Sequence, residues 1–360
     1  MQQSDTNNNR VYSLDFIRVI ACMGICWLHY RLFLCPQGVF FGNRLINEEE
    51  LGWEFKFFVE VFFGLSGYLS FSQIEKIRQG RSFSQYYKIK LIRILPMLTI
   101  GTILYEIMVA VMVENSRFIR DDFSAPSLWG IISSSIGIQE GWGFINSRIN
   151  MESWYLDVLL LCFAFFYFIV WISMKLNVKV NILFGIMIII GCTASSYSFS
   201  IPFLNSQDGR GYEAFFTGLL LATHVSRKGV RIKDAILSGF ILFVYGMYHV
   251  FWPELLFFGR YHLMALLVTP ALIVFMETSI MKKIFLWKYW ETLGKITFST
   301  YILHVVLIFA IFNLETRLRL SIDYAHEVML IAFIILAFTI GAVAYFAIEK
   351  PVTKFLLKAT

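Results

Sequence analysis

Residues 12–30 read YSLDFIRVIACMGICWLHY, a run that is apolar enough to cross a membrane and yet carries the ionisable residues Asp15, Arg18 and His29. A charge at the centre of a bilayer helix costs at least ~2.5–3.5 kcal/mol, so each one needs a partner or a water-filled cavity. Arg18 and His29 are about three helical turns apart, which places them ~16 Å apart along the axis and on one face. Asp15 lies one turn before Arg18 on that face and can pair with it.

This polar face has two simpler explanations. Arg18 could extend to the membrane surface while His29 is an ordinary interfacial ring. Alternatively, Cys22, Cys26 and His29 lie on neighbouring turns and could bind a metal, but no further Cys or His cluster completes the ligand set. We therefore predict no metal site, and we take the polar face as a candidate functional site.

The composition of the whole chain predicts an integral membrane protein. Hydrophobic residues make up 58% of the 360 residues, and charged residues only 16%. An ordinary soluble domain has roughly 45–50% apolar and about 25% charged residues. A chain of this length supplies about ten spans if each uses ~20 residues and the loops are short. The soluble classes are therefore excluded.

Hydropathy predicts an all-α fold of about ten transmembrane helices. They form one membrane domain over residues 12–350, between polar tails at 1–11 and 351–360. The predicted spans are 12–32, 53–73, 94–113, 154–174, 181–198, 211–226, 234–252, 262–279, 296–313 and 326–347.

The basic residues predict the orientation of this domain. If the N-terminus is cytosolic, twenty of the 31 Lys and Arg residues fall in the cytosolic segments, ten in the outer segments, and Arg18 within a span. The positive-inside rule therefore places both termini in the cytosol. The formal net charge of +6 then reflects topology and gives no reason to expect nucleic-acid binding.

The longest outer segment, residues 114–153, contains Trp129 and Trp142 among several charged residues. It is either a lid or binding surface, or a solvated loop with interfacial aromatic residues. The chain shows no internal repeat, which weakens the alternative of a transporter, since many transporters are built from repeated halves.

Further polar motifs are distributed over nearly the whole chain. Besides the Arg-x10-His spacing of Arg18 and His29, seven short motifs lie within the predicted spans or next to their ends. They are FFGLSGY at 62–68, KLIRILP at 90–96, SWYL at 153–156, FFTG at 215–218, LGK at 293–295, STYILH at 299–304 and IEKP at 348–351.

In this order and spacing, the motifs resemble those of the membrane-bound acyltransferase family 3. That family usually has Arg where this chain has Lys90, and many members have His where this chain has Glu152. The resemblance implies acyl transfer from acetyl-coenzyme A, as a co-substrate rather than a bound cofactor, to a carbohydrate or small secreted product. It also implies a multi-pass protein of the bacterial cytoplasmic membrane.

The resemblance and the intramembrane position together select the candidate site residues. His29 and His304 are the catalytic candidates, because an ionisable group within a span is a functional candidate by default. The carrier candidates are Arg18, Arg93 and Ser66. Glu106 and Trp154 are the substrate candidates, and Glu106 is also a candidate to orient a histidine. Simpler explanations are close helix packing at residues 64–67 and the positive-inside rule at Lys90 and Arg93.

The expected mechanism assigns two roles along the polar face. His29 is the base, since burial favours the neutral imidazole that accepts a hydroxyl proton. Arg18 and Arg93 lie nearer the cytosol and would bind the phosphates of the carrier.

Because the sequence continues only briefly after the last predicted span, we expect the chain to deliver the acyl group without a fused hydrolase-like domain. The competing hypotheses are a transporter or flippase that uses the same polar face and a non-catalytic assembly protein.

Overall fold

The computed structural model describes residues 11–46, 54–112, 128–142, 150–197, 199, 201–251 and 260–359, and most of these residues are helical. Within these ranges, seven helices are long and apolar enough to cross a membrane. They are Tyr12–Phe33, Phe55–Arg78, Phe83–Ala110, Trp154–Lys175, Val180–Tyr197, Tyr289–Leu318 and Glu327–Lys358. The chain therefore has the all-α membrane fold that its composition predicted, with one short β-hairpin in addition.

Helices also lie at the other three predicted spans. They are α8 (Ser206–Lys228), α9 (Ile232–Phe251) and a shorter apolar helix, Arg260–Met276. Within α8, Asp208 and Glu213 are fully buried, so the helix places polar side chains inside the protein. This is why its hydropathy is low although it packs in the interior.

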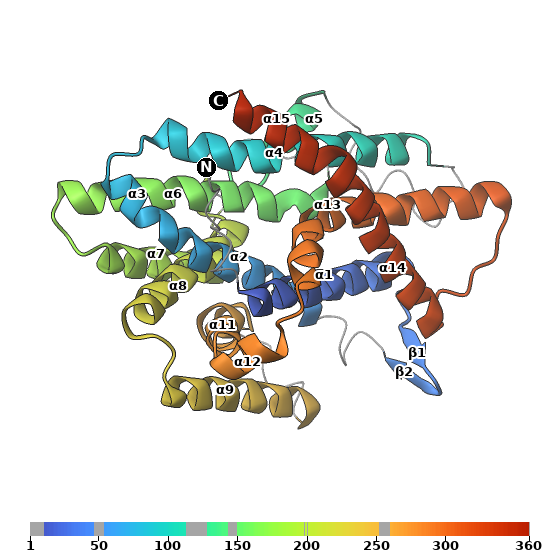
Figure 1. The fold of residues 1–360 in the computed structure, drawn as a ribbon. Helices are drawn as coiled ribbons and strands as arrows, with labels where there is room; N and C mark the ends of the chain where they lie inside the picture. Colours follow the sequence, from blue (N-terminus) through green and yellow to red (C-terminus); the bar gives the residue numbers. More distant parts are fainter. Residues whose placement is uncertain are drawn as a thin grey trace, which may run out of the picture.

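The elements follow one another along the chain (Figure 1). The first half contains α1 (Tyr12–Phe33), β1 (Val39–Phe41), β2 (Arg44–Ile46), η2 (Glu54–Phe57), α2 (Phe58–Ser70), η3 (Phe71–Gln73), α3 (Ile74–Arg78), α4 (Phe83–Ala110), α5 (Leu128–Ser135), η5 (Met151–Ser153), α6 (Trp154–Lys175) and α7 (Val180–Tyr197). After α8 and α9 come α10 (Arg260–Leu263), η6 (Met264–Val268), α11 (Thr269–Met276), α12 (Ser279–Ile284), α13 (Tyr289–Leu318), α14 (Glu327–Ala344), η7 (Tyr345–Glu349) and α15 (Lys350–Lys358).

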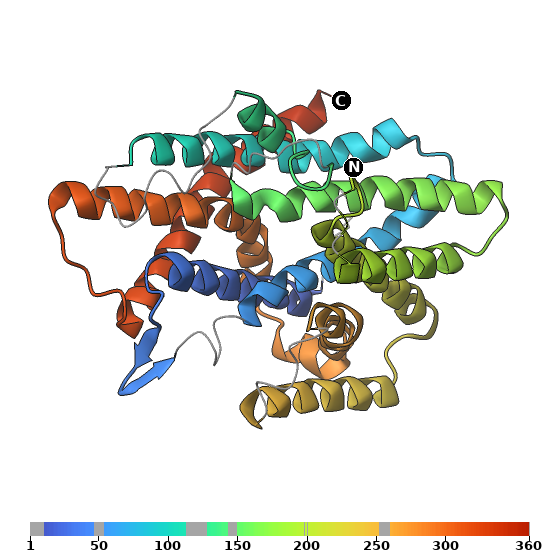
Figure 2. The same cartoon turned by 180° about the vertical axis from the view of Figure 1, so that it is seen from behind.

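Helix α1 lies near the middle of the molecule in both views (Figures 1 and 2) and packs most extensively against α13. Its Cys22 and Cys26 are completely buried. The Ser13 hydroxyl donates to the carbonyl oxygen of Met276 at 2.7 Å, which fixes the start of α1 against α11. At the other end, the Tyr30 hydroxyl donates to the carbonyl oxygen of Tyr324 at 2.7 Å. The polar face of α1 is therefore held inside the protein rather than turned to lipid.

Glycines allow α2 and α8 to approach closely. A Cβ atom built on Gly67 would overlap the backbone carbonyl oxygen of Phe215, and one built on Gly218 would overlap the carbonyl oxygen of Gly64. Only small residues permit such backbone contact. The glycines of the FFGLSGY and FFTG motifs thus have a packing role, whereas Ser66 between them faces a cavity described below.

The start of α4 is defined by local hydrogen bonds. Ser82 and Gln85 form a capping box, in which each side chain accepts a hydrogen bond from the backbone N–H of the other residue. The Tyr167 hydroxyl of α6 donates to the carbonyl oxygen of Arg81 at 3.0 Å. Helices α4 and α6 run side by side in both views (Figures 1 and 2). This arrangement fixes the depth of Lys90 and Arg93, two and three turns into α4.

The described part of the predicted outer segment, residues 128–142, packs against the protein. Ser133, Ser134 and Gln139 are buried, and the backbone N–H groups of Gln139 and Glu140 both donate to one carboxylate oxygen of Asp157 at 3.1 Å. This part is therefore not a solvated loop. Residues 114–127 and 143–149 of the segment lie outside the described residues.

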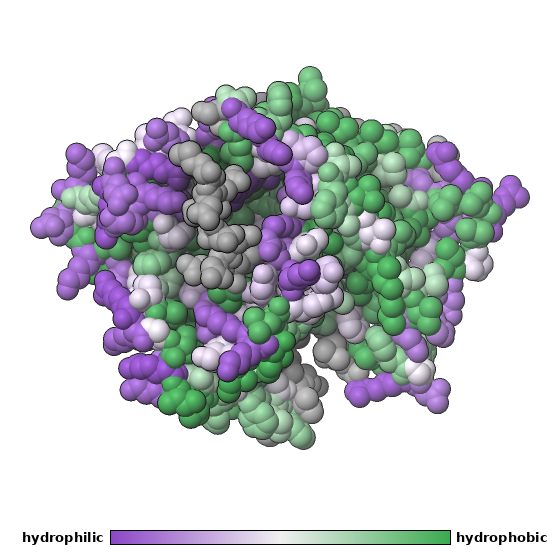
Figure 3. Space-filling view, in the orientation of Figure 1, coloured by the Kyte–Doolittle hydropathy of each residue, from purple (hydrophilic) through white to green (hydrophobic). Residues whose placement is uncertain are grey.

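The surface separates polar from apolar regions. Hydrophilic residues gather at the left of Figure 3, around α3 and the end of α6, and again at the far right, whereas a hydrophobic surface lies between them over α14. Such a band is expected where a helical protein faces lipid.

Candidate active site

Three distant segments bring His29, His304 and Glu152 into contact. His29 comes from the end of α1, His304 from the middle of α13, and Glu152 from the turn η5 that precedes α6. The Nε2 atom of His29 lies 2.7 Å from a carboxylate oxygen of Glu152. Its Nδ1 atom lies 2.7 Å from Nε2 of His304. Both ring nitrogens of His29 are thus occupied within a buried chain of hydrogen bonds.

The hydrogen-bond partners fix where the protons of this chain lie. The Nδ1 atom of His304 is 2.6 Å from the carbonyl oxygen of Tyr301, which can only accept, so this nitrogen carries a proton. In a neutral His304 ring, Nε2 is then an acceptor, and Nδ1 of His29 must donate to it. The remaining nitrogen of His29 faces the Glu152 carboxylate. A single proton is therefore shared between His29 and Glu152.

The environment of Glu152 favours the ionised form of its carboxyl group. Burial by itself would raise the pKa of the Glu152 carboxyl, but its interaction and hydrogen bond with His29 hold it below its usual range. Glu152 is therefore a carboxylate in the resting pair. The sequence predicted His29 as the base but did not reveal its contact with Glu152.

Tyr301 connects this pair to a cavity. Its hydroxyl donates to the carbonyl oxygen of Glu152 at 2.6 Å, and its own carbonyl oxygen accepts from His304. Its side chain also lines a cavity of about 300 Å³ between α1, α2, α4, α6 and α13. Tyr301 thus contacts both the cavity and the hydrogen-bonded chain that contains Glu152 and His304.

The cavity is lined by three cationic residues, Arg18, Lys90 and Arg93. The guanidinium of Arg18 pairs with Asp15 at 2.9 Å, as the sequence indicated, and the Arg18 side chain remains 26% exposed. Lys90 lies over the ring of Phe163, with its ammonium 3.9 Å from the ring centroid. The cavity therefore combines apolar walls with a concentration of positive charge.

The structure thus brings five of the seven predicted site residues to one region. Arg18, Arg93 and Ser66 all line the cavity, and His29 and His304 lie behind Tyr301. This placement agrees with a division of the polar face into a cationic part and a histidine part.

The two predicted substrate residues have other surroundings. The ring of Trp154 lies 4.8 Å from the guanidinium carbon of Arg210, and that guanidinium forms a buried ion pair with Glu60 at 2.6 Å. In the described part of the chain, Glu106 is half-buried and has no hydrogen bond or ion pair with a histidine. Glu152, not Glu106, is the carboxylate that orients His29.

Two of the C-terminal motifs also meet in space. The Ser299 hydroxyl of α13 donates to the carboxylate of Glu349 in η7. Gly341 of α14 packs so closely that a Cβ atom there would overlap the Thr300 side chain. These contacts hold the α13 segment that carries Tyr301 and His304, which gives the IEKP and STYILH motifs a common structural purpose.

The fold and site define a polytopic helical membrane protein with a buried histidine–carboxylate pair beside a cationic cavity. A family model described as an acyltransferase domain matches residues 11–348. The chain therefore belongs to acyltransferase family 3, as its motifs indicated, and is a membrane acyltransferase. Searches of curated proteins and of solved structures found no match.

Proposed function

We propose that the protein transfers an acetyl group from cytosolic acetyl-coenzyme A to a hydroxyl of an extracytoplasmic or lipid-linked carbohydrate in the bacterial cytoplasmic membrane. The observation that carries this proposal is the position of Tyr301. Its side chain lines the cavity that contains Arg18, Lys90 and Arg93, and its polar groups bond to Glu152 and His304. The cationic cavity and the histidine–carboxylate pair therefore adjoin at this residue.

The cationic cavity suits the carrier. Coenzyme A presents phosphates, which guanidinium groups bind by charge-assisted and two-pronged hydrogen bonds. Its pantetheine arm is narrow and largely uncharged, which fits the apolar walls beyond the cations. A cavity of about 300 Å³ holds only part of such a molecule, so the nucleotide end would remain towards the cytosol.

The His29–Glu152 pair supplies the acid–base chemistry. As the acceptor hydroxyl oxygen attacks the thioester carbonyl carbon, the hydroxyl proton passes to the Glu152 carboxylate. The carbon–sulfur bond then breaks, and the thiolate of coenzyme A takes a proton from the pair, which returns to its resting charge. His304 keeps the His29 ring oriented throughout. A positioned acid–base group of this kind contributes roughly 10²–10⁴-fold to the rate.

The identity of donor and acceptor rests on the family resemblance, and the site chemistry is consistent with it. A transporter would also use buried ionisable residues as a proton pathway. Family membership favours transfer, because an acyltransferase needs both a base and a cationic carrier site, and Tyr301 contacts both.

Transfer by the purified protein is the direct test. The protein in detergent is incubated with acetyl-coenzyme A labelled in the acetyl group and with cell-surface glycan. We expect labelled glycan and an equal amount of free coenzyme A. Labelled glycan should be absent with His29→Ala and Glu152→Gln proteins that remain folded. Uptake of glycan precursor into proteoliposomes without acetylation would support the transporter hypothesis and contradict the proposal.

A further inference from the structure

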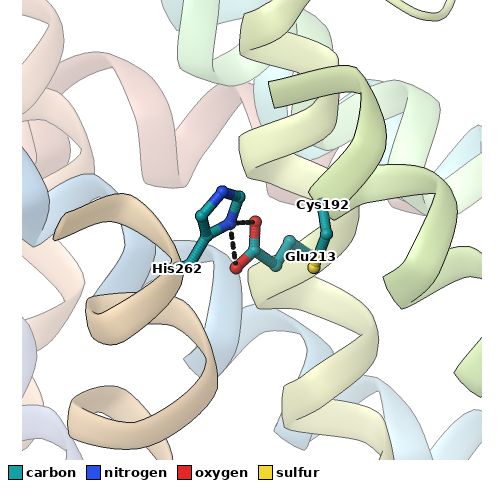
Figure 4. A group of neighbouring side chains, drawn as sticks. All are labelled: Cys192, Glu213 and His262. Atoms are coloured by element: carbon teal, nitrogen blue, oxygen red, sulfur yellow. Dashed lines mark hydrogen bonds and ion pairs between the residues drawn. The ribbon is translucent and has the colours of Figure 1, made fainter. Parts of the chain in front are cut away.

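A second histidine–carboxylate pair lies outside the site described above. His262 of α10 faces Glu213 of α8, and its Nδ1 atom is 2.9 and 2.8 Å from the two carboxylate oxygens. Figure 4 shows these two contacts, with the other ring nitrogen directed away from the carboxylate. That nitrogen, Nε2, lies 3.0 Å from the hydroxyl oxygen of Ser196 in the last turn of α7. Three helices thus align a hydroxyl, an imidazole and a carboxylate.

The direction of each hydrogen bond follows from the partners. Glu213 is completely buried, and its carboxylate can only accept, so Nδ1 of His262 carries the proton. In the neutral ring, Nε2 is then an acceptor, and the Ser196 hydroxyl must donate to it. A hydroxyl that donates to an imidazole, which in turn donates to a buried carboxylate, is the arrangement that activates a serine for attack on a carbonyl.

The carboxylate is held rigidly. The Ser195 hydroxyl donates to the carbonyl oxygen of Gly191 at 2.9 Å and lies 3.3 Å from the Glu213 carboxylate. The backbones of α7 and α8 nearly touch, since a Cβ atom on Gly191 would lie 2.6 Å from the backbone nitrogen of Glu213. Glu213 is therefore a positioning residue whose carboxylate has little freedom to leave His262.

The surroundings of Ser196 are exposed and apolar. Ser196 itself is exposed, and beside it Tyr197 is 74% and Ile201 54% exposed. The rings of Tyr197 and Phe199 stack with centroids 6.1 Å apart. Aromatic and aliphatic side chains at the end of a membrane-spanning helix contact the lipid tails and headgroup region. A substrate that reaches Ser196 is therefore one whose apolar part lies in the membrane.

We propose that Ser196, His262 and Glu213 form a second acyl-transfer site that takes an acyl group from a membrane-lipid ester. The Ser196 oxygen attacks the ester carbonyl carbon while His262 accepts the hydroxyl proton. The ester carbon–oxygen bond breaks, and the departing alcohol takes the proton from His262. Ser196 then carries the acyl group as an ester, until water or a second alcohol repeats the same steps in reverse and releases it.

A metal ion bound by Glu213 and His262 is the alternative to a serine site here. Ligand atoms of Cys192, Glu213 and His262 lie within 4.8 Å of one another, and Figure 4 shows the Cys192 sulfur beside the carboxylate. The serine arrangement accounts for more of the geometry, because it gives both nitrogens of His262 a hydrogen-bond partner and needs no displacement of the ring from Glu213.

Labelling with an alkyl fluorophosphonate tests the proposal. An activated serine displaces fluoride from this reagent and forms a stable oxygen–phosphorus bond, whereas unactivated hydroxyls do not react. We expect the full-length protein in detergent to be labelled once, at residue 196 by mass spectrometry. Ser196→Ala should abolish labelling, and His262→Ala should slow it by at least ~100-fold, the lower range for loss of a positioned base.

The control is Thr193→Ala, which removes a hydroxyl from an exposed position on the same helix and should leave labelling unchanged. Thermal unfolding of each variant in detergent checks that it is folded. Absence of labelling in the folded wild-type protein would overturn the proposal. So would labelling at another residue, a wild-type rate in His262→Ala, or one bound zinc per chain that is lost in Cys192→Ser.

Discussion

The Nε2 atom of His29 lies 2.7 Å from the Glu152 carboxylate, while its Nδ1 atom is bonded to His304. Neither ring nitrogen is free to contact a hydroxyl directly. The pair must therefore act as one acid–base unit, with the Glu152 side chain, 17% exposed, more accessible than that of His29, 8% exposed.

The first prediction concerns the histidines. His29→Ala removes the partner of Glu152 and should lower turnover by about 10²–10⁴-fold. His304→Ala should also lower turnover, because Nδ1 of His29 then loses its buried acceptor and the ring its orientation. Initial rates with labelled acetyl-coenzyme A check both variants at equal amounts of folded protein. Near-normal turnover in either variant would show that the hydrogen-bonded chain is structural.

The second prediction uses the ionisation of Glu152. Because its pKa lies below the ordinary value of 4.5, the carboxylate persists into acid, and wild-type turnover should fall only as the pH drops below that value. Because the pKa of Glu152 is lowered in the folded state, the His29–Glu152 pair stabilises the folded protein above about pH 4.5. This stabilisation is lost as the pH falls through the lowered pKa. Turnover and unfolding temperature as functions of pH measure the two effects.

Two substitutions at Glu152 sharpen this test. Glu152→Gln keeps the shape but removes the base, and should reduce turnover at every pH. Glu152→His introduces the residue that many family members have at this position. The Glu152→His protein should retain activity. The pH below which its turnover falls should move up towards about 6.5, the ordinary pKa of histidine. An unchanged pH profile in Glu152→His would mean that residue 152 does not carry the proton.

Much of the fold follows from the sequence, because hydropathy depends on local composition. Helices occur at all ten predicted spans, although only seven in the described ranges are both long and apolar enough to cross a membrane. α8 shows the limit of this reasoning. It buries polar side chains such as Asp208 and Glu213 against other helices, and their partners cannot be deduced from a single segment.

The site was predictable to the extent that its residues share one helix or one motif. The common face of Arg18 and His29 follows from helical geometry alone. The contact of His29 with Glu152 depends on how the turn before α6 packs against α1 and α13, which no local pattern encodes. The sequence did draw attention to Glu152, because this carboxylate stands at a motif position where many family members have histidine. It did not reveal that Glu152 contacts His29.

The third prediction tests helix approach. Gly67→Ala places a methyl group against the Phe215 carbonyl of α8, so the helices must separate, at a cost of about 1–3 kcal/mol. The matched control is Gly185→Ala in α7, where the added methyl group has no neighbour within 4 Å and improved helix propensity should leave stability equal or slightly higher. Thermal unfolding in detergent compares the two. Equal unfolding temperatures would contradict the close contact.

The fourth prediction concerns orientation in the membrane. Because twenty of the 31 basic residues lie in the predicted cytosolic segments, a topology reporter at Gln79 should be cytosolic. A reporter at Asn146 should be extracytoplasmic. Accessibility to a membrane-impermeant thiol reagent, with a single cysteine introduced at either position, gives an independent measurement. The opposite pattern would place the Arg18 end of α1 outside and would remove the route of a cytosolic carrier to the cavity.

The last prediction separates carrier binding from proton transfer. Arg18 lines the cavity but lies about three turns from His29 on α1, and its guanidinium has geometry that a lysine ammonium does not reproduce. Arg18→Lys should weaken acetyl-coenzyme A binding by roughly 10–150-fold, the range that one charge-assisted contact of ~1.5–3 kcal/mol supplies. His29→Ala should leave this affinity almost unchanged, because the pair acts on the acceptor hydroxyl. Titration of the donor by calorimetry against both variants in detergent distinguishes the roles. Equal weakening in the two variants, or none in Arg18→Lys, would contradict the division, and Arg18 would then be only the structural partner of Asp15.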